Sequence, residues 1–305
     1  MTDVSEQGPC AVVVTFNPQL EVLTPLLVQL NAQCDFVVID NCSAAGDRIA
    51  AITEGLTRCG ELMRLGGNEG LARALNIGIE WARQRGHDPI FLFDQDSRPG
   101  TDFIARMLAA CDEIEKLCER PVAAIGPRLV DPRNGRRTPF KVFDRLWRRS
   151  DRPLADASQH FQAHFLITSG CLLNGAHLDA IGPMKEDYFI DNVDLEWCFR
   201  ARARGFELAG TDAAELLHVI GEHSDNPLVS AGLMAQHSPE RSYYSSRNRR
   251  HLWHCDYAPL GWKLRDRVRF LLKACWLLLT SSRRRQYWHN IRNGLRDAGN
   301  LSRPR

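Results

Sequence analysis

Short apolar runs alternate with stretches of helical length over the first part of the chain. Four such runs are AVVVTF (11–16), DFVVID (35–40), ELMRL (61–65) and PIFLFD (89–94). The segment 70–86 lies between the last two, and its apolar residues recur at helical spacing. Nearly continuous apolar strands separated by helices indicate a parallel sheet that is covered on both faces. The sequence therefore predicts an α/β fold with a doubly wound, mostly parallel sheet.

Each of these predicted strands ends at a polar or glycine-rich sequence. The first two strands end at Asn17 and Asn41, the third at two glycines (66–67), and the fourth at the triplet DQD (94–96). In open α/β sheets, ligands bind beyond the carboxyl ends of the strands. These four strand ends therefore predict a ligand site along one edge of the sheet.

The rest of the chain contains weaker strand signals and long helical stretches. The expected elements are a strand at 121–127, a loop or flap over 131–160, a strand at 165–174, a helix over 191–204 that ends at Gly205, and short strands at 206–210 and 215–220. From residue 241 onward the chain is expected to be helical, with breaks near Pro259 and Ser281.

The charge of the chain is strongly segregated. Residues 241–305 contain 16 Lys and Arg against 3 Asp and Glu, whereas the other 240 residues contain 23 against 34. We therefore divide the chain into a catalytic-type α/β domain (1–240) and a basic helical region (241–305). Such a basic region favours an anionic partner. Nucleic acid is not expected, because no nucleic-acid-binding motif accompanies the basic residues.

Two interpretations of the basic region remain open. From Trp262 onward, Lys and Arg are interleaved with large apolar residues such as Leu271 and Leu272, as in a helix that lies in a membrane interface. The alternative is a helix that covers the core and turns a charged face outward. No segment reaches the roughly 18 uncharged apolar residues that span a bilayer, and the ten cysteines form no CxxC pair. The first residues, MTDVSEQGPC, lack the basic start and apolar stretch that are expected of a signal peptide. We expect a cytoplasmic protein, peripheral on the inner membrane under the first interpretation.

Asp94 and Asp96 bear most directly on chemistry. An Asp-x-Asp triplet is common by chance, and a solvated loop would explain it equally well in isolation. At a strand end, however, alternate residues direct both carboxylates toward one site. Hard oxygen ligands suit Mg²⁺ or Mn²⁺, which would in turn bridge the phosphates of a nucleotide.

The chain resembles the family 2 glycosyltransferases with a GT-A fold, and among them the bacterial rhamnosyltransferases that use dTDP-L-rhamnose. The resemblance covers roughly residues 10 to 255. The segments that carry it are VVVTFNP (12–18), VVIDN (37–41), GGNEGLARALNIGI (66–79), FLFDQDS (91–97), SGCLLN (169–174), YFIDNVDLEWCFRARARG (188–205), LLHVIG (216–221) and RSYYSSRN (241–248).

The resemblance implies a nucleotide-sugar site that is built from several strand ends. The residues expected to contact the donor are Thr15, Phe16, Asn17, Asp40, Asn68, Gly70, Arg73, Asn76, Asp94, Gln95, Asp96 and Arg247. Asp40 would contact the base, although a simple turn also explains it. Asp96 is the expected metal ligand, and Asp94 either binds the metal as well or lies nearer the ribose. Arg247 would neutralise charge on the leaving group, the alternative being a solvated basic helix.

The resemblance also implies a catalytic base and a third metal ligand. Inverting glycosyl transfer needs a carboxylate that removes the proton of the acceptor hydroxyl. Asp194 is the predicted base and Asp191 the second candidate, while helix capping could explain one of the two. His218 is predicted to complete the metal site with Asp94 and Asp96, and His223 is a weaker alternative ligand. Without the resemblance, His218 would be interpreted as a packed core histidine.

The resemblance implies transfer of L-rhamnose from dTDP-L-rhamnose to a hydroxyl of a lipid-linked saccharide, as in O-antigen synthesis, or of a rhamnolipid-type glycolipid. One alternative is another donor, such as a UDP-hexose. Another is a non-catalytic nucleotide-sugar-binding protein of the same fold. A sugar-1-phosphate nucleotidyltransferase is disfavoured, because TFNPQ (15–19) is neither glycine-rich nor basic.

Overall fold

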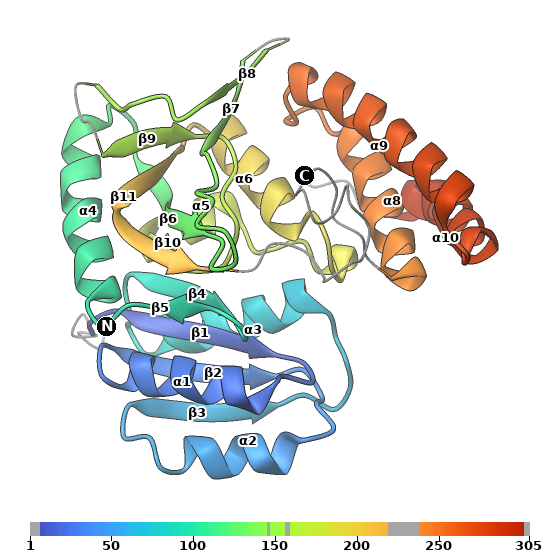
Figure 1. Ribbon diagram of the computed structural model, residues 1–305. Helices are drawn as coiled ribbons and strands as arrows, with labels where there is room; N and C mark the ends of the chain where they lie inside the picture. Colours follow the sequence, from blue (N-terminus) through green and yellow to red (C-terminus); the bar gives the residue numbers. More distant parts are fainter. Residues whose placement is uncertain (1–6, 145–146, 156–158, 219–237, 302–305) are drawn as a thin grey trace.

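The computed structural model describes residues 7–144, 147–155, 159–218 and 238–301. A twisted central sheet carries helices on both faces, and three C-terminal helices lie to one side of it (Figure 1). The strand order is β3-β2-β1-β4-β10-β6-β11-β5, and β9 also pairs with β11. The strands of this sheet are β1 (Cys10–Thr15), β2 (Asp35–Asp40), β3 (Cys59–Arg64), β4 (Ile90–Asp94), β5 (Arg98–Pro99), β6 (Val122–Val130), β9 (His160–Ala163), β10 (Cys171–Leu173) and β11 (Glu207–Leu217).

The expected mostly parallel, doubly wound sheet is confirmed. Strand β1 pairs in parallel with β2 and β4, and β2 pairs in parallel with β3. Strand β10 is antiparallel to β4 and β6, so the sheet is mixed, and β6 and β11 are again parallel. The carboxyl ends of β1, β2, β3 and β4 consequently lie along one edge, as the sequence predicts.

The two faces of β1 belong to two different hydrophobic cores. Ala11 and Val13 pack with the leucines of α1 on one face, and Val12 and Val14 pack with α3 on the other. Helix α1 buries Leu23, Leu26, Leu27 and Leu30, which is the spacing of one helical face. The helices of this part are α1 (Leu20–Asn31), α2 (Gly46–Thr53), α3 (Leu71–Gln84), α4 (Phe103–Leu117), α5 (Leu178–Ile181) and α6 (Val193–Ala203).

Three expectations for the middle of the chain are corrected. The predicted loop over 131–160 contains an antiparallel hairpin of β7 (Lys141–Asp144) and β8 (Trp147–Ser150), whose strands are too short for a clear alternating pattern. Only residues 171–173 of the predicted strand 165–174 form a strand, because Gly170, with φ of +71°, turns the chain just before them. The strands expected at 206–210 and 215–220 are one strand, β11, with an irregularity between Thr211 and Glu215; residues 219–220 lie outside the described part.

The C-terminal region forms three helices, as predicted. They are α8 (Pro239–His254), α9 (Leu260–Thr280) and α10 (Arg284–Asp297), so the breaks fall at the expected positions. The hydroxyl of Ser238 accepts a hydrogen bond from the Arg241 N–H (3.3 Å) and caps α8, whose first residue is proline. A Cβ at Gly294 would lie 2.3 Å from the Tyr243 carbonyl oxygen, so α10 packs closely on α8.

No helix in the described ranges is both long and apolar enough to cross a membrane. The predicted boundary between residues 240 and 241 falls in the first turn of α8 and stays a prediction.

Candidate active site

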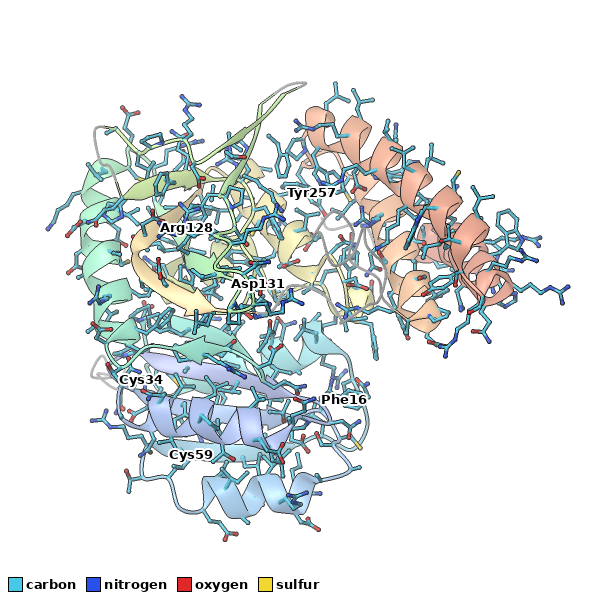
Figure 2. The ribbon with its side chains drawn as sticks, viewed as in Figure 1. Phe16, Cys34, Cys59, Arg128, Asp131 and Tyr257 are labelled. Atoms are coloured by element: carbon cyan, nitrogen blue, oxygen red, sulfur yellow. The ribbon has the colours of Figure 1, made fainter. Side chains whose placement is uncertain are left out.

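The loops that follow β1 and β2 are tied together by a buried carboxylate. Asp40 is fully buried and accepts hydrogen bonds from Thr15 Oγ1 (2.9 Å), Ser43 Oγ (2.5 Å) and the Ser43 N–H (3.1 Å). The Asn17 N–H donates to Ser43 Oγ (2.8 Å), and the Asn17 side-chain oxygen accepts a hydrogen bond from a backbone N–H in the loop after β2 (2.9 Å). Phe16, which lies between Thr15 and Asn17 at the carboxyl end of β1, is 43% exposed (Figure 2). A braced rim thus presents an exposed aromatic ring, which is suited to stacking on a base.

The ends of β1 and β4 are joined in the same way. The Phe16 N–H donates a hydrogen bond to Gln95 Oε1 (2.7 Å). Gln95 therefore spans from the DQD triplet to the first strand end, and the predicted residues Phe16 and Gln95 lie side by side.

Pairing of β5 with β11 brings a histidine to the aspartate pair. Strand β5 follows the turn after Asp96, and its Arg98 pairs with Leu217 at the end of β11. His218 comes directly after that strand. One ligand atom each from Asp94, Asp96 and His218 lies within 4.8 Å of the other two, and His218 Nδ1 is 4.0 Å from Asp96 Oδ1.

The residues of this cluster fit a divalent cation. His218 Nδ1 is buried and has no hydrogen-bond partner among the described residues, although a buried ring nitrogen normally has one. Burial raises the pKa of the Asp94 carboxyl, which accepts a hydrogen bond from the buried Ser169 hydroxyl. A cation between the carboxylates and the imidazole would satisfy the free nitrogen and favour the ionised carboxyls. Carboxylate and imidazole ligands together suit Mn²⁺, and the two carboxylates suit Mg²⁺.

Asp194 lies in the first turn of α6, near enough to Asp94 for the charge of that carboxyl to act on it. The pKa of Asp194 is raised from 3.8 to about 7, mainly by burial and also by the charges of Asp94 and Asp191. The Leu195 N–H donates to Asp194 Oδ1 (2.8 Å) and opposes that rise. A carboxyl group that changes protonation near neutral pH is suited to accept a proton from a hydroxyl.

Asp191, the second candidate for the base, is held by an arginine. Arg241 Nε lies 3.1 Å from both Asp191 carboxylate oxygens, and Arg241 Nη2 lies 2.9 Å from Oδ1. Both oxygens of this carboxylate are therefore engaged by the guanidinium. The geometry therefore favours Asp194 over Asp191 as the base.

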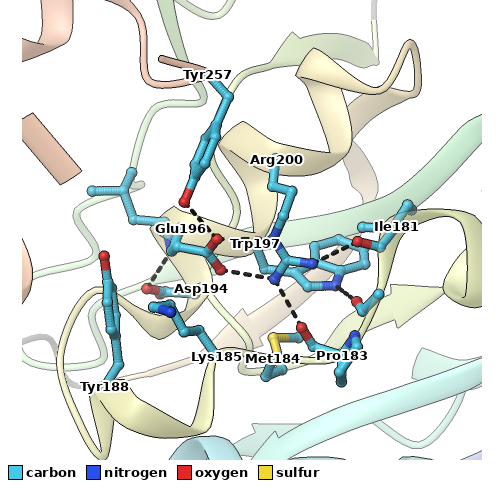
Figure 3. Close-up of polar contacts among 12 residues, drawn as sticks. Ile181, Pro183, Met184, Lys185, Tyr188, Asp194, Glu196, Trp197, Arg200 and Tyr257 are labelled. Atoms are coloured by element: carbon cyan, nitrogen blue, oxygen red, sulfur yellow. Dashed lines mark hydrogen bonds and ion pairs between the residues drawn. The ribbon is translucent and has the colours of Figure 1, made fainter. Parts of the chain in front are cut away.

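Glu196, the acidic residue that follows Asp191 and Asp194 in the sequence, is structural. Glu196 is fully buried and accepts hydrogen bonds from Arg200 Nε and Nη2 and from the Tyr257 hydroxyl, each at 2.8 Å (Figure 3). Arg200 also donates to the carbonyl oxygens of Ile181 (2.5 Å) and Pro183 (2.8 Å). This network fastens α6 to the segment before it and to the chain beyond α8.

The loop that leads into α6 has an unusual backbone and is held by α8. Phe189, Asp191 and Asn192 have φ of +61°, +66° and +61°, which non-glycine residues rarely adopt. The fully buried Asn248 side chain donates to the carbonyl oxygens of Tyr188 (3.0 Å), Ile190 (2.9 Å) and Asp191 (2.8 Å). The position of Asp194 thus depends on a residue of the C-terminal region.

Arg247 supports the same loop. Its Nη2 donates to the carbonyl oxygens of Asp187 and Tyr188, the latter at 3.2 Å. Its guanidinium carbon also lies 5.5 and 5.2 Å from the ring centroids of Tyr243 and Tyr244. The predicted contact of Arg247 with the donor diphosphate stays a prediction.

The residues predicted after β3 make contacts within the protein. Asn68 Oδ1 accepts from Asn41 Nδ2 (2.9 Å) and the Gly70 N–H (3.1 Å). Gly70 has a φ of +86°, and a Cβ there would lie 2.6 Å from the Phe189 ring. This glycine is therefore required by the packing of α3 against the loop before α6.

Asn76 and Arg73 lie further along α3. The Asn76 side chain bonds to both the N–H (2.8 Å) and the carbonyl oxygen (2.9 Å) of Met184, so it braces α3 against that segment. Arg73 is about half exposed and lies 3.4 Å from Glu69 and 3.9 Å from Glu186. Of the two, Arg73 is the one whose side chain can turn toward a ligand.

Two residues of the site are absent from the sequence-based prediction. Ser169 holds Asp94, and Arg241 holds Asp191. Ser169 lies in the segment SGCLLN, where the glycine that follows it marks a turn. Arg241 lies in the segment RSYYSSRN, in which Arg247 is the residue predicted to contact the donor. His223, the alternative metal ligand, lies outside the described residues.

Comparison with known proteins gives concordant matches. The model of the family described as Glycosyl transferase family 2 matches residues 10–182. The dTDP-rhamnosyl transferase RfbF of Shigella flexneri is 31% identical over 282 residues, which are 91% of this chain and 90% of that protein. The galactofuranosyltransferase GlfT1 of Mycolicibacterium smegmatis is 25% identical, over 80% of this chain and 82% of that protein.

Solved structures share the fold at lower identity. S. aureus TarS (residues 1–349) superposes with a TM-score of 0.60 at 16% identity, covering 96% of this chain and 81% of that one. GalNAc-T7 superposes with a TM-score of 0.57 at 14% identity, covering 85% and 50%. These likenesses bear on the fold alone and agree with the expected GT-A architecture. The chain belongs to glycosyl transferase family 2 and is an enzyme of that family.

Proposed function

We propose that this enzyme is an inverting rhamnosyltransferase that moves L-rhamnose from dTDP-L-rhamnose to a hydroxyl group of a lipid-linked saccharide or a glycolipid. The likeness to the Shigella flexneri rhamnosyl transferase along nearly the whole chain supports the donor. The observation that carries the reaction type is the position of Asp194 beside the cluster of Asp94, Asp96 and His218.

Asp194 acts as the general base. Its carboxylate accepts the proton of the acceptor hydroxyl while the hydroxyl oxygen attacks the anomeric carbon of the sugar. The new carbon–oxygen bond forms on the face opposite the nucleotide, and the bond to the diphosphate breaks. The leaving dTDP takes the bonding electron pair, so the configuration at the anomeric carbon inverts. Arg241 keeps the charge of Asp191 paired and leaves Asp194 as the proton acceptor.

Asp94, Asp96 and His218 would hold a divalent cation, Mg²⁺ or Mn²⁺. A bound cation supplies positive charge for the diphosphate, on which negative charge develops as the sugar leaves. GalNAc-T7, a neighbour in fold, was solved with UDP, GalNAc and Mn²⁺, which supports the use of a divalent cation. Phe16 and Asn17 would form the wall against which the base of the nucleotide lies, and the buried Asp40 would hold that wall in place.

A donor panel tests the proposal. The full chain is titrated with dTDP-L-rhamnose, UDP-glucose and UDP-N-acetylglucosamine, each with Mn²⁺ and with a chelator. We expect dTDP-L-rhamnose to bind tightest and to lose affinity in the chelator, and the Asp96→Asn variant to lose that metal-dependent part. Tight binding of a UDP-sugar without binding of dTDP-L-rhamnose would contradict the donor assignment.

A further inference from the structure

Helix α9 has an outward face made of large apolar side chains. Apart from one adjacent pair, the residues of this face are spaced three, four or seven positions apart, so they lie on one side of the helix. Leu279 is 80% exposed and Leu260 is 68% exposed. The α9 face consists of Leu260, Leu264, Val268, Leu271, Leu272 and Leu279. Such a set of exposed leucines marks an interaction surface.

The opposite side of α9 is fixed to the rest of the molecule. Trp262, Asp266 and Leu277 are buried. The Trp262 ring lies 5.2 Å from the Phe199 ring, and Asp266 accepts hydrogen bonds from Arg249 and from Trp253 (2.9 Å). These contacts set the rotation of α9, so the α9 face points away from the body of the protein. Figure 1 shows α9 at the periphery of the molecule.

Basic residues border the α9 face. Arg267 and Arg269 are exposed on the same helix, and three exposed arginines (283–285) follow its end. The sequence has no Asp or Glu between Arg267 and Arg296. Exposed leucines bordered by arginines are the composition of a helix that lies in a lipid interface.

We infer that the α9 face docks on an anionic lipid bilayer, with α9 lying in the plane of the interface. The inference rests on the proposed function in one respect, since a lipid-linked acceptor would be presented in that bilayer. Arginines near an anionic surface attract it, whereas two copies of this chain joined through their α9 faces would bring their arginine borders together. Charge complementarity therefore favours lipid over a second copy.

Sedimentation of the full chain with vesicles tests this inference. We expect binding to vesicles of equal parts phosphatidylcholine and phosphatidylglycerol, and weaker binding to phosphatidylcholine alone or at high salt. Replacing both Leu271 and Leu272 with Glu should weaken binding by at least about tenfold. Replacing Arg283, Arg284 and Arg285 with Gln should weaken it by roughly fivefold for each charge removed.

Matched controls separate this surface from general effects. Val28→Glu with Leu117→Glu makes the same change at exposed apolar residues of α1 and α4 and should leave vesicle binding unchanged. Equal vesicle binding by the Leu271→Glu/Leu272→Glu variant and the parent would overturn the inference. The inference would also be overturned if the parent did not bind vesicles but formed a dimer in analytical ultracentrifugation, and if the Leu271→Glu/Leu272→Glu variant were a monomer.

A failure of the membrane inference can be distinguished from a failure of the proposed function. Binding of dTDP-L-rhamnose and transfer to a detergent-free, soluble acceptor analogue do not depend on the α9 face, so both should survive in the leucine variant. Loss of vesicle binding alone would leave the rhamnosyltransferase proposal intact. Lack of dTDP-L-rhamnose binding would leave the vesicle result unaffected.

Discussion

At the scale of single residues, Asp194 combines burial with acidity. A carboxyl group that is moved out of water resists ionisation, and the neighbouring charges of Asp94 and Asp191 increase that resistance. The same environment that makes the group a proton acceptor near neutral pH therefore makes its ionised form costly for the folded protein. Stability and reactivity are opposed at this position.

This opposition predicts how stability depends on pH. The pKa of Asp194 is about 7 in the folded protein against 3.8 as its ordinary value, so its ionisation lowers the free energy of unfolding as pH rises through this range. In chelator, Asp194→Asn should therefore be more stable than the parent at pH 8, by on the order of 1 kcal/mol, with the difference shrinking at pH 5. Urea unfolding at both pH values measures it.

The control for this measurement is Asp112→Asn, which removes an exposed carboxyl of α4. It should change stability little at either pH. A destabilisation by Asp194→Asn that is the same at pH 5 and pH 8 would show that the carboxyl is not strained by burial.

The cluster of Asp94, Asp96 and His218 gives a second prediction at this scale. Asp96→Asn and His218→Gln each remove one ligand, so each should weaken Mn²⁺ binding in the presence of dTDP by at least about tenfold. Calorimetric titration of Mn²⁺ measures the affinity, and Asp112→Asn serves again as the control. Unchanged affinity in the His218→Gln variant would limit the metal site to the two aspartates.

At the scale of elements, helix α8 controls the loop before α6. Three residues of that loop have positive φ, and Asn248 and Arg247 bond to its carbonyl oxygens. Because α10 packs closely on α8 at Gly294, the C-terminal helices form a support for this loop. The basic region thus contacts the loop before the proposed base.

Asn248→Ala tests this support. It leaves the carbonyl oxygens of Ile190 and Asp191 without this donor, whereas that of Tyr188 keeps the bond from Arg247, so the free energy of unfolding should fall by about 2 kcal/mol. At a temperature where the variant is fully folded, kcat should fall strongly while KM for the donor changes little, because Asp194 is misplaced. Asn134→Ala, at an exposed loop residue, is the matched control. A normal kcat in folded Asn248→Ala protein would reduce Asn248 to a purely structural role.

At the scale of the whole molecule, the sheet is the part that the sequence predicts best. Strands β1, β2 and β4 are buried on both faces, so their apolar runs are unbroken and end where the strands end, whereas β3 is a partly exposed edge strand. The hairpin of β7 and β8 was missed because each strand has only four residues, and the strand-like run before Gly170 is shaped instead by that glycine's turn.

The candidate site is likewise predicted from the sequence only in part. Asp94 and Asp96 are predicted from their position at a strand end, whereas Asp194 and His218 are predicted from the family resemblance. The pairing of Arg241 with Asp191 and the bonds of Asn248 could not be predicted, because they join residues about fifty to sixty positions apart. Such contacts follow from how α8 packs against the loop before α6, which local pattern does not encode.

The account rests most on Asp194 as the base beside the metal cluster. The decisive measurement is the single-turnover rate of rhamnosyl transfer from dTDP-L-rhamnose, with saturating Mn²⁺, for Asp194→Asn and Asp191→Asn in parallel. We predict that Asp194→Asn binds the donor but loses transfer by about a thousandfold or more, and that Asp191→Asn keeps a measurable rate. Full activity in Asp194→Asn together with an inactive Asp191→Asn would contradict the account and move the base to Asp191.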